Sequence, residues 1–168
     1  WLNDAQSEDE KKKNLALLFD LEKMKTSQQT AFDKLKQKQK PSGGFSWFDG
    51  SDESEYITRH ILAGLGHLVK LNTTDKTIEK IDQISEKGIP FIDSKFLEYH
   101  KARTKNGKAI DKLIWINPNS DLHYLYTRSF YLTDYPLSDT LKKVTKRYLE
   151  TAKENWLNYS LYEKGMTA

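Results

Sequence analysis

The sequence predicts an all-α fold built from antiparallel helical hairpins. Apolar side chains recur three and four residues apart along most of the 168 residues, which is the spacing of one helix face. Helix-capping residues and glycine or proline breakers divide these segments at short intervals. No alternating apolar and polar run marks a clear strand. Five to seven helices joined by short turns are therefore expected, with no strand or only a minor one around residues 113–116.

The first two predicted helices lie before a proline. Ser7 and Glu10 have the spacing of a capping box, and the leucines that follow repeat on one helical stripe. Thr26 or Ser27 is expected to cap a second helix, because hydroxyl side chains favour that position. Pro41 and the glycines after it end the second helix.

The central part of the chain predicts three more helices. Asp52 and Glu55 form a second capping box before a stripe of isoleucine and leucine residues. Gly64 and Gly66 lie inside that helix, which suggests the close approach of a neighbouring backbone. The following helix begins at Thr74 and is expected to break near Gly88 and Pro90. A further helix is predicted over residues 94–105.

The last third predicts two helices after an ambiguous segment. Residues 109–116 fit either a short helix or an extended segment. A helix that carries Leu122 and Phe130 is expected to stop before Pro136. Ser138 then caps a long final helix, whose apolar stripe continues to Tyr159. We therefore predict one helical domain over residues 1–168.

Composition and motifs exclude several functional classes. Basic and acidic residues number 27 and 24, giving a net charge of +3; they alternate along the helices, which favours solvated faces over a nucleic-acid surface. The chain has no cysteine and no apolar run that could span a membrane. His60 and His67 share a helix face but have no third ligand, so no metal is predicted. No nucleotide or nucleophile motif is present, so we predict no cofactor and no enzyme.

The loop Ser42–Gly50 is the least ordinary segment. Two adjacent glycines, Gly43 and Gly44, permit positive φ angles and close backbone contacts. The aromatic residues after them are Phe45, Trp47 and Phe48. The preferred interpretation is a plug, in which the aromatic side chains fill the ends of neighbouring helices. The alternative is an exposed aromatic patch that binds a partner.

Two consecutive motifs around this loop are distinctive: Gly43-Gly44-Phe45-x-Trp47-Phe48 and Tyr56-Ile57-Thr58-x-His60-Ile61-x-Ala63-Gly64-x-Gly66. Related segments precede and follow them: Leu17-Leu18-Phe19-Asp20-Leu21, Tyr124-Leu125-Tyr126-x-Arg128-Ser129 and Tyr159-Ser160-Leu161-Tyr162. Together they resemble the bacterial alpha-2-macroglobulin family, in its Bacteroidetes-type form. The resemblance covers most of the chain.

The resemblance implies a fold and a function. The chain would be part of the alpha/alpha toroid that forms the thioester domain of an endopeptidase inhibitor, in the periplasm or at the cell envelope. Family members trap proteases after bait cleavage, through an internal Cys–Gln thioester. The partners implied are target proteases, reached through a full-length parent, and other domains of that parent. The chain is accordingly expected to be a segment of a longer protein.

The sequence lacks the residues on which the family's thioester chemistry depends. The Cys-x-Glu-Gln box is absent from these 168 residues, so the chain by itself cannot form a thioester and is expected to be a non-catalytic scaffold. Its candidate contribution to the wall of the thioester pocket consists of Trp47, Phe48, Tyr56 and His60. The preferred interpretation of the same residues is structural: hydrophobic core with a histidine whose hydrogen bonds are satisfied. The alternative function is a helical interaction module that uses loop 42–50. A toroid enzyme of the terpene cyclase type would need an Asp-rich or zinc site, which the sequence lacks.

Overall fold

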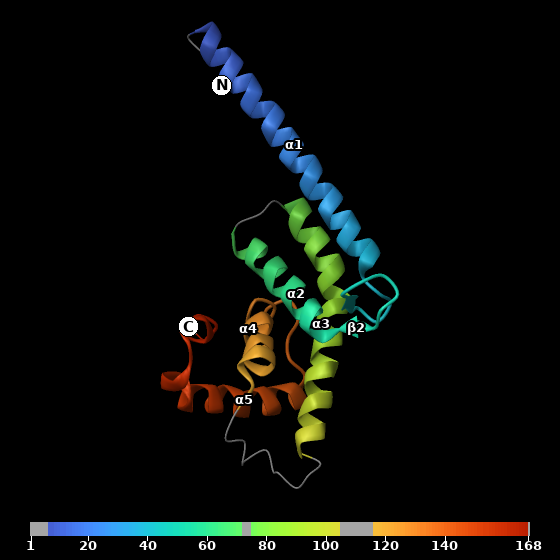
Figure 1. Ribbon diagram of the computed structural model, residues 1–168, viewed down its shortest axis with the longest axis vertical. Helices are drawn as coiled ribbons and strands as arrows, with labels where there is room; N and C mark the ends of the chain where they lie inside the picture. The colour runs from blue at the N-terminus through green and yellow to red at the C-terminus, as the bar shows by residue number, and fades with distance from the viewer. Residues whose placement is uncertain (1–6, 72–74, 105–115, 168) are drawn as a thin grey trace. The chain divides into compact units, whose positions relative to one another are not determined.

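The computed structural model describes residues 7–71, 75–104 and 116–167 (Figure 1). Its described elements are helical apart from one two-stranded sheet, which confirms the all-α prediction. The single domain over residues 1–168 stays a prediction; the contacts divide the chain into two compact units, Trp1–Lys38 and Gln39–Ala168. Each unit is described below by itself. The partial alpha/alpha toroid stays a prediction.

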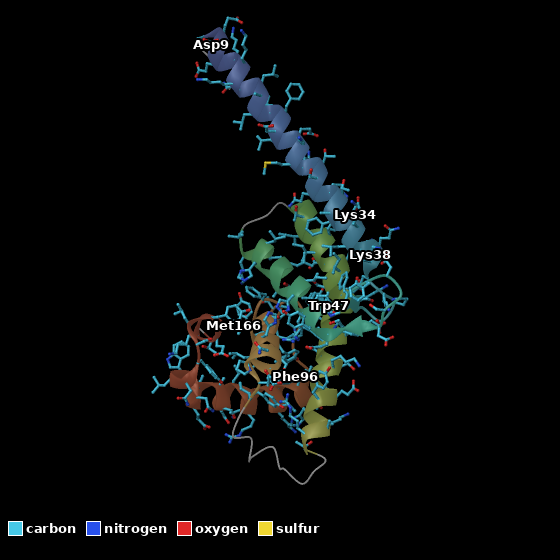
Figure 2. All side chains as sticks on the ribbon, viewed as in Figure 1. Asp9, Lys34, Lys38, Trp47, Phe96 and Met166 are labelled. Atoms are coloured by element: carbon cyan, nitrogen blue, oxygen red, sulfur yellow. The ribbon has the colours of Figure 1, made fainter. Side chains whose placement is uncertain are left out.

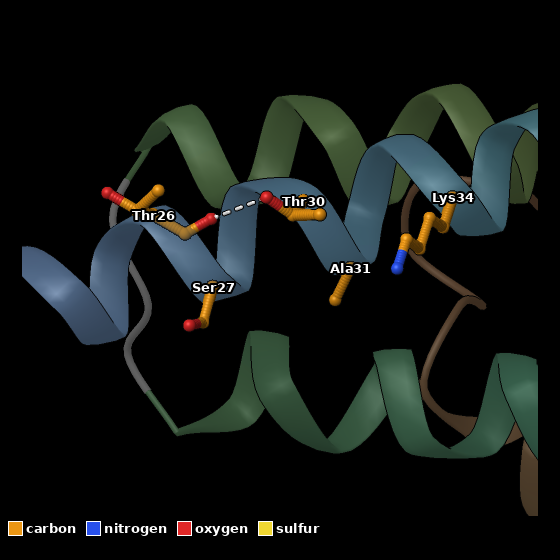
Figure 3. A pocket seen from close by; sticks show the side chains of 5 residues that line it. All are labelled: Thr26, Ser27, Thr30, Ala31 and Lys34. Atoms are coloured by element: carbon orange, nitrogen blue, oxygen red, sulfur yellow. Dashed lines mark hydrogen bonds between the residues drawn. The ribbon is translucent and has the colours of Figure 1, made fainter.

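The first unit is the helix α1, Glu8–Lys38. Ser7 caps it as predicted, because its Oγ accepts the Glu10 amide at 3.1 Å. The predicted second start at Thr26 or Ser27 is wrong. The Thr26 hydroxyl donates to the Glu22 carbonyl at 2.9 Å. The Thr30 hydroxyl donates to the Thr26 carbonyl, also at 2.9 Å (Figure 3). A hydroxyl satisfied by the preceding turn is compatible with a helix interior, so α1 continues.

A short hairpin opens the second unit. The Lys40 amide donates to the Gly44 carbonyl at 2.9 Å, closing the turn after α1. Strand β1, Phe45–Ser46, then pairs antiparallel with β2, Glu53–Ser54, in the register Phe45 to Ser54. The sequence placed no strand here, because two residues are too few to produce an alternating pattern.

Helix α2, Glu55–Lys70, follows β2 directly. Its cap is Ser54, whose side chain accepts the Ile57 amide, so the cap predicted at Asp52 is wrong. Of the two glycines inside α2, Gly64 faces open space, while a Cβ on Gly66 would lie 2.6 Å from the Cβ of Phe130. The expected close neighbour therefore exists at Gly66 only, and it is a side chain rather than a backbone.

Helix α3, Asp75–Thr104, is continuous through Gly88 and Pro90, so the predicted break is wrong. Proline removes one backbone hydrogen bond from a helix. Burial of one apolar face on both sides of the proline opposes that loss; this face contains Ile81, Ile84, Ile89, Ile92 and Phe96. Gly88 belongs to the packed face, since a Cβ there would lie 3.0 Å from Leu62.

The remaining elements begin at Asn117. A π-helical turn, Pro118–Leu122, leads into α4, His123–Ser129. Helix α5, Asp139–Glu154, is capped by Ser138 as predicted. It ends earlier than expected, and a 3₁₀ turn, Trp156–Asn158, and a short helix α6, Leu161–Gly165, follow. A new capping box at Ser160 and Glu163 explains this restart. The segment predicted over 109–116 and the strand around 113–116 lie outside the described residues, except for Ile116.

The core of the second unit lies where α2 packs against α3 and α4, with α5 beside α3 (Figure 1). Phe96 lies at its centre (Figure 2), stacked on Tyr124 with ring centroids 3.9 Å apart. The Tyr124 hydroxyl donates to Asp93 at 2.7 Å, and Asp93 also forms an ion pair with Arg128 at 2.9 Å. A polar network therefore runs through the apolar core.

Candidate functional site

The base of the hairpin is held tightly against α3. Gly43 has a φ of +94°, and a Cβ at this residue would lie 2.1 Å from the carbonyl oxygen of Lys87. A Cβ on Gly44 would lie 2.8 Å from both the Phe91 ring and the Glu53 side chain. Only glycine fits both positions without displacing a neighbour. The two glycines thus fix where the aromatic residues after them emerge.

Replacing Gly44 with valine is expected to destabilise the protein by about 1–3 kcal/mol, because the new side chain overlaps Phe91 and Glu53. The measurement is urea unfolding followed by circular dichroism. Gly64→Ala serves as the control, since Gly64 faces open space and alanine favours the helix. An unchanged midpoint for Gly44→Val would contradict the close packing of this turn.

The aromatic side chains of the loop divide between the interior and the surface. Phe45 is buried, and its amide donates to Thr58 Oγ1 at 2.9 Å. Trp47 and Phe48 lie at the tip of the hairpin and are 61% and 73% exposed. The plug interpretation therefore describes Phe45 alone, whereas Trp47 and Phe48 have the exposure that the alternative requires. The sequence could not separate them, because all three have similar hydrophobicity.

A row of aromatic rings in contact begins at Trp47, which is labelled in Figure 2. The Trp47 ring lies 5.9 Å from that of Tyr56, with the planes 11° apart. Tyr56 contacts His60 one helical turn later at 4.1 Å, and His60 stacks on His123 of α4 at 4.2 Å. We call Trp47, Tyr56, His60 and His123 the aromatic row. It joins the hairpin, α2 and α4 on one face.

The row continues along α4 through edge contacts. His123 meets Tyr126 with centroids 6.1 Å apart, and Tyr126 meets Phe130 at 5.1 Å. His67 packs on Phe130 at 4.7 Å, and its Nε2 is hydrogen-bonded to the Tyr126 hydroxyl. His60 and His67 therefore lie in one extended aromatic surface, at different places along it.

Hydrogen bonds fix the orientation of the His60 ring. Its Nδ1 lies 2.9 Å from the backbone carbonyl oxygen of Tyr56. A carbonyl only accepts, so Nδ1 carries a proton, and in the neutral ring Nε2 is the free acceptor. The aromatic row thus combines the half-buried His60 ring with the faces of Trp47 and Tyr56.

A buried ion pair supports the row from beneath. Arg59 is 1% exposed, and its Nε contacts the Glu55 carboxylate. Its Nη1 donates to the carbonyl oxygens of Asn119 and Ser120 at 3.1 and 2.9 Å. Burial raises the pKa of Glu55, although the charge of Arg59 opposes that rise. Arg59 therefore ties α2 to the turn that precedes α4 and sets the spacing of His60 and His123.

His123 is held in the neutral form. It is 5% exposed, and burial lowers its pKa to about 4, with the charge of Arg59 and the neighbouring His60 acting in the same direction. Because His123 is neutral, its ring can stack on His60 without bringing two positive charges together.

Stability is expected to fall as the pH drops from about 6.5 to about 4. The unfolded chain takes up a proton at His123 in this window and the folded protein does not, so protons favour unfolding. The loss should amount to about 1–3 kcal/mol. Urea unfolding across this pH range measures it. His123→Asn should flatten the curve; equal slopes for wild type and His123→Asn would contradict the burial effect.

The four predicted wall residues are only partly brought together. Trp47, Tyr56 and His60 join one row, whereas Phe48 points from the hairpin tip without a ring contact among the described residues. His123 and Tyr126 were missed. Their spacing of three residues is a weak signal, and only the packing of α4 on α2 brings His123 onto His60.

Within the described residues, no group of three or more His, Asp or Glu side chains is placed to hold a metal ion. Among the helices of the same residues, none combines the length and apolar character needed to cross a bilayer. Comparison of the chain with protein families, with curated proteins and with solved structures gives no match in any of the three.

Proposed function

We propose that the chain is a non-catalytic scaffold segment of a bacterial alpha-2-macroglobulin-like endopeptidase inhibitor, acting in the periplasm or at the cell envelope. The observation that carries the proposal is the convergence of motif residues: Trp47 comes from the Gly-Gly-Phe motif, and Tyr56 and His60 come from the motif after it, yet the three rings contact one another in one row. Two sequence motifs that together form one surface support a shared role.

The chemistry of trapping belongs to the parent in this proposal. With no cysteine among its residues, this chain supplies no thioester. The aromatic row supplies a surface that is apolar and flat at Trp47 and Tyr56 and offers a hydrogen-bond acceptor at His60. Such a surface can line a pocket that shields a reactive acyl group from water.

A protease-trapping assay on the full-length parent tests this function. The parent should form covalent complexes with a protease, and Trp47→Ala or Tyr56→Ala should make its thioester lose reactivity faster by hydrolysis. Leu157→Ala is the matched control, because Leu157 is 83% exposed and lies outside the row. The isolated chain should trap nothing. Full trapping by the isolated chain, or a parent without a Cys-x-Glu-Gln box, would overturn the proposal.

A second candidate is a helical interaction module that binds a protein partner through loop 42–50. The exposure of Trp47 and Phe48 favours it, since large aromatic side chains at a hairpin tip are typical of interface centres. Here Phe48→Ala and Trp47→Ala should both weaken binding, whereas the scaffold function requires the row and not Phe48. The effect of Phe48→Ala therefore separates the two candidates.

A further inference from the structure

Helix α1 exposes an unusual amount of apolar surface. Between residues 15 and 24 it carries six large apolar side chains that are 36–69% exposed: Leu15, Leu17, Leu18, Phe19, Leu21 and Met24. Isolated exposed leucines are common on protein surfaces, but six within ten residues of one helix are not.

Part of this surface forms a regular seam. Leu17, Leu21 and Met24 are spaced four and three residues apart, and the same spacing extends back to Asn14 and forward through Gln28 to Ala31. A repeat that alternates three and four residues keeps one stripe facing a partner helix along its length, as in a two-stranded coiled coil. In heptad terms Asn14, Leu21 and Gln28 occupy positions a, and Leu17, Met24 and Ala31 occupy positions d.

One pair of charges beside the seam favours a second copy of the chain as the partner. Asp20 lies at position g and Lys25 at position e, five residues later. In a parallel, in-register pair a g residue meets the e residue of the next heptad on the other helix, so Asp20 of each copy faces Lys25 of the other. Among the described residues, neither side chain has an ion-pair partner within its own chain. At this pair of positions the seam is therefore complementary to itself.

The polar residues in the seam agree with this pairing. Asn14 and Gln28 each meet their own copy across the axis when the register is parallel, and amide side chains can both donate and accept there. An asparagine at position a is a recognised means of fixing register at a cost in stability. With only Leu17, Leu21 and Met24 as large apolar contacts, the association should be weak and dependent on concentration.

We propose that α1 pairs with α1 of a second copy of this chain as a parallel, in-register, two-stranded coiled coil over Asn14–Ala31. This inference does not depend on the proposed function. Leu15 and Phe19 lie on the opposite side of the helix, at positions b and f, and take no part in the seam. A substitution inside the seam can therefore be compared with one outside it on the same exposed segment.

Sedimentation velocity of the full chain over a wide concentration range tests the pairing. Wild type should pass from monomer to dimer, and Leu21→Asp should weaken dimerisation about tenfold or more, because it places two carboxylates in the seam. Phe19→Asp should leave the dimer intact. Both side chains are exposed, so both variants should keep their helical circular dichroism. A wild-type monomer throughout, or equal weakening by both variants, would overturn the proposal.

Orientation and charge pairing are tested separately. The chain has no cysteine, so Asn14→Cys introduces a single thiol that should form a disulfide-linked dimer on oxidation if the helices are parallel and in register. Gln29→Cys, at position b, should not. Asp20→Lys should weaken the dimer, and adding Lys25→Asp should restore it. Failure of Asn14→Cys to cross-link above Gln29→Cys, or of the double exchange to restore pairing, would contradict the proposed arrangement.

Discussion

Replacing Phe45 with alanine is expected to lower the free energy of unfolding by about 3–5 kcal/mol. The side chain is 2% exposed, and it lies in a strand anchored to α2 through Thr58. Truncation removes a whole ring from a site that cannot collapse easily, because the glycine turn before it already touches α3. Equilibrium unfolding in urea, followed by circular dichroism, measures the change.

Phe48→Ala is the matched control for this experiment. It is the same substitution three residues later in the same loop, at a side chain that is 73% exposed. Its effect should stay within about 0.5 kcal/mol, as for most surface substitutions. If the two variants were destabilised equally, the division of the loop into a buried Phe45 and an exposed tip would be wrong.

Replacing Arg128 with leucine is expected to destabilise the protein by about 3 kcal/mol, since it leaves the largely buried Asp93 carboxylate without its cation. Arg128 is 2% exposed and contacts Asp93 at 2.9 Å, and its Nη2 donates to the Tyr135 carbonyl at 2.9 Å. Burial already raises the pKa of Asp93, although Arg128 and Tyr124 oppose the rise. Chemical unfolding at neutral pH measures the loss.

The pH dependence of the stability of Arg128→Leu provides a second test. Without Arg128 the pKa of Asp93 should rise further, so the folded variant binds a proton more readily than the unfolded chain does. Its deficit relative to wild type should therefore shrink as the pH falls and Asp93 becomes neutral. Lys142→Leu is the control, because the Lys142–Asp139 pair is exposed and contributes little. A deficit independent of pH would show that lost packing, not the unpaired charge, dominates.

The helical content of the chain was predictable because it depends on local signals. Ser7 and Ser138 cap the helices that the sequence assigned to them. The errors arose where one side chain has two uses. Thr26 can cap a helix or bond to the preceding turn, and Pro90 can end a helix or be tolerated inside one. In both cases contacts made along the continuing helix decide the outcome, and such contacts are not visible in local sequence.

The candidate site was predictable to a similar extent. Tyr56 and His60 are one helical turn apart, so their contact follows from the sequence once α2 is assigned. Trp47 reaches them only because a two-residue sheet folds the hairpin beside the start of α2. His123 is more than sixty positions beyond His60 in the sequence, and its place in the row depends on Arg59 binding the turn before α4. No local pattern encodes that bond.

The proline inside α3 has a consequence for hydrogen exchange. Pro90 has no amide, so the Glu86 carbonyl cannot accept the usual hydrogen bond from position 90. The series of hydrogen-bonded amides is therefore interrupted at Pro90, although the helix itself is continuous. Buried contacts lie on both sides, at Ile84 before the proline and at Phe96 after it. In native-state exchange α3 should therefore behave as two protected blocks, each reporting the opening of its own surroundings.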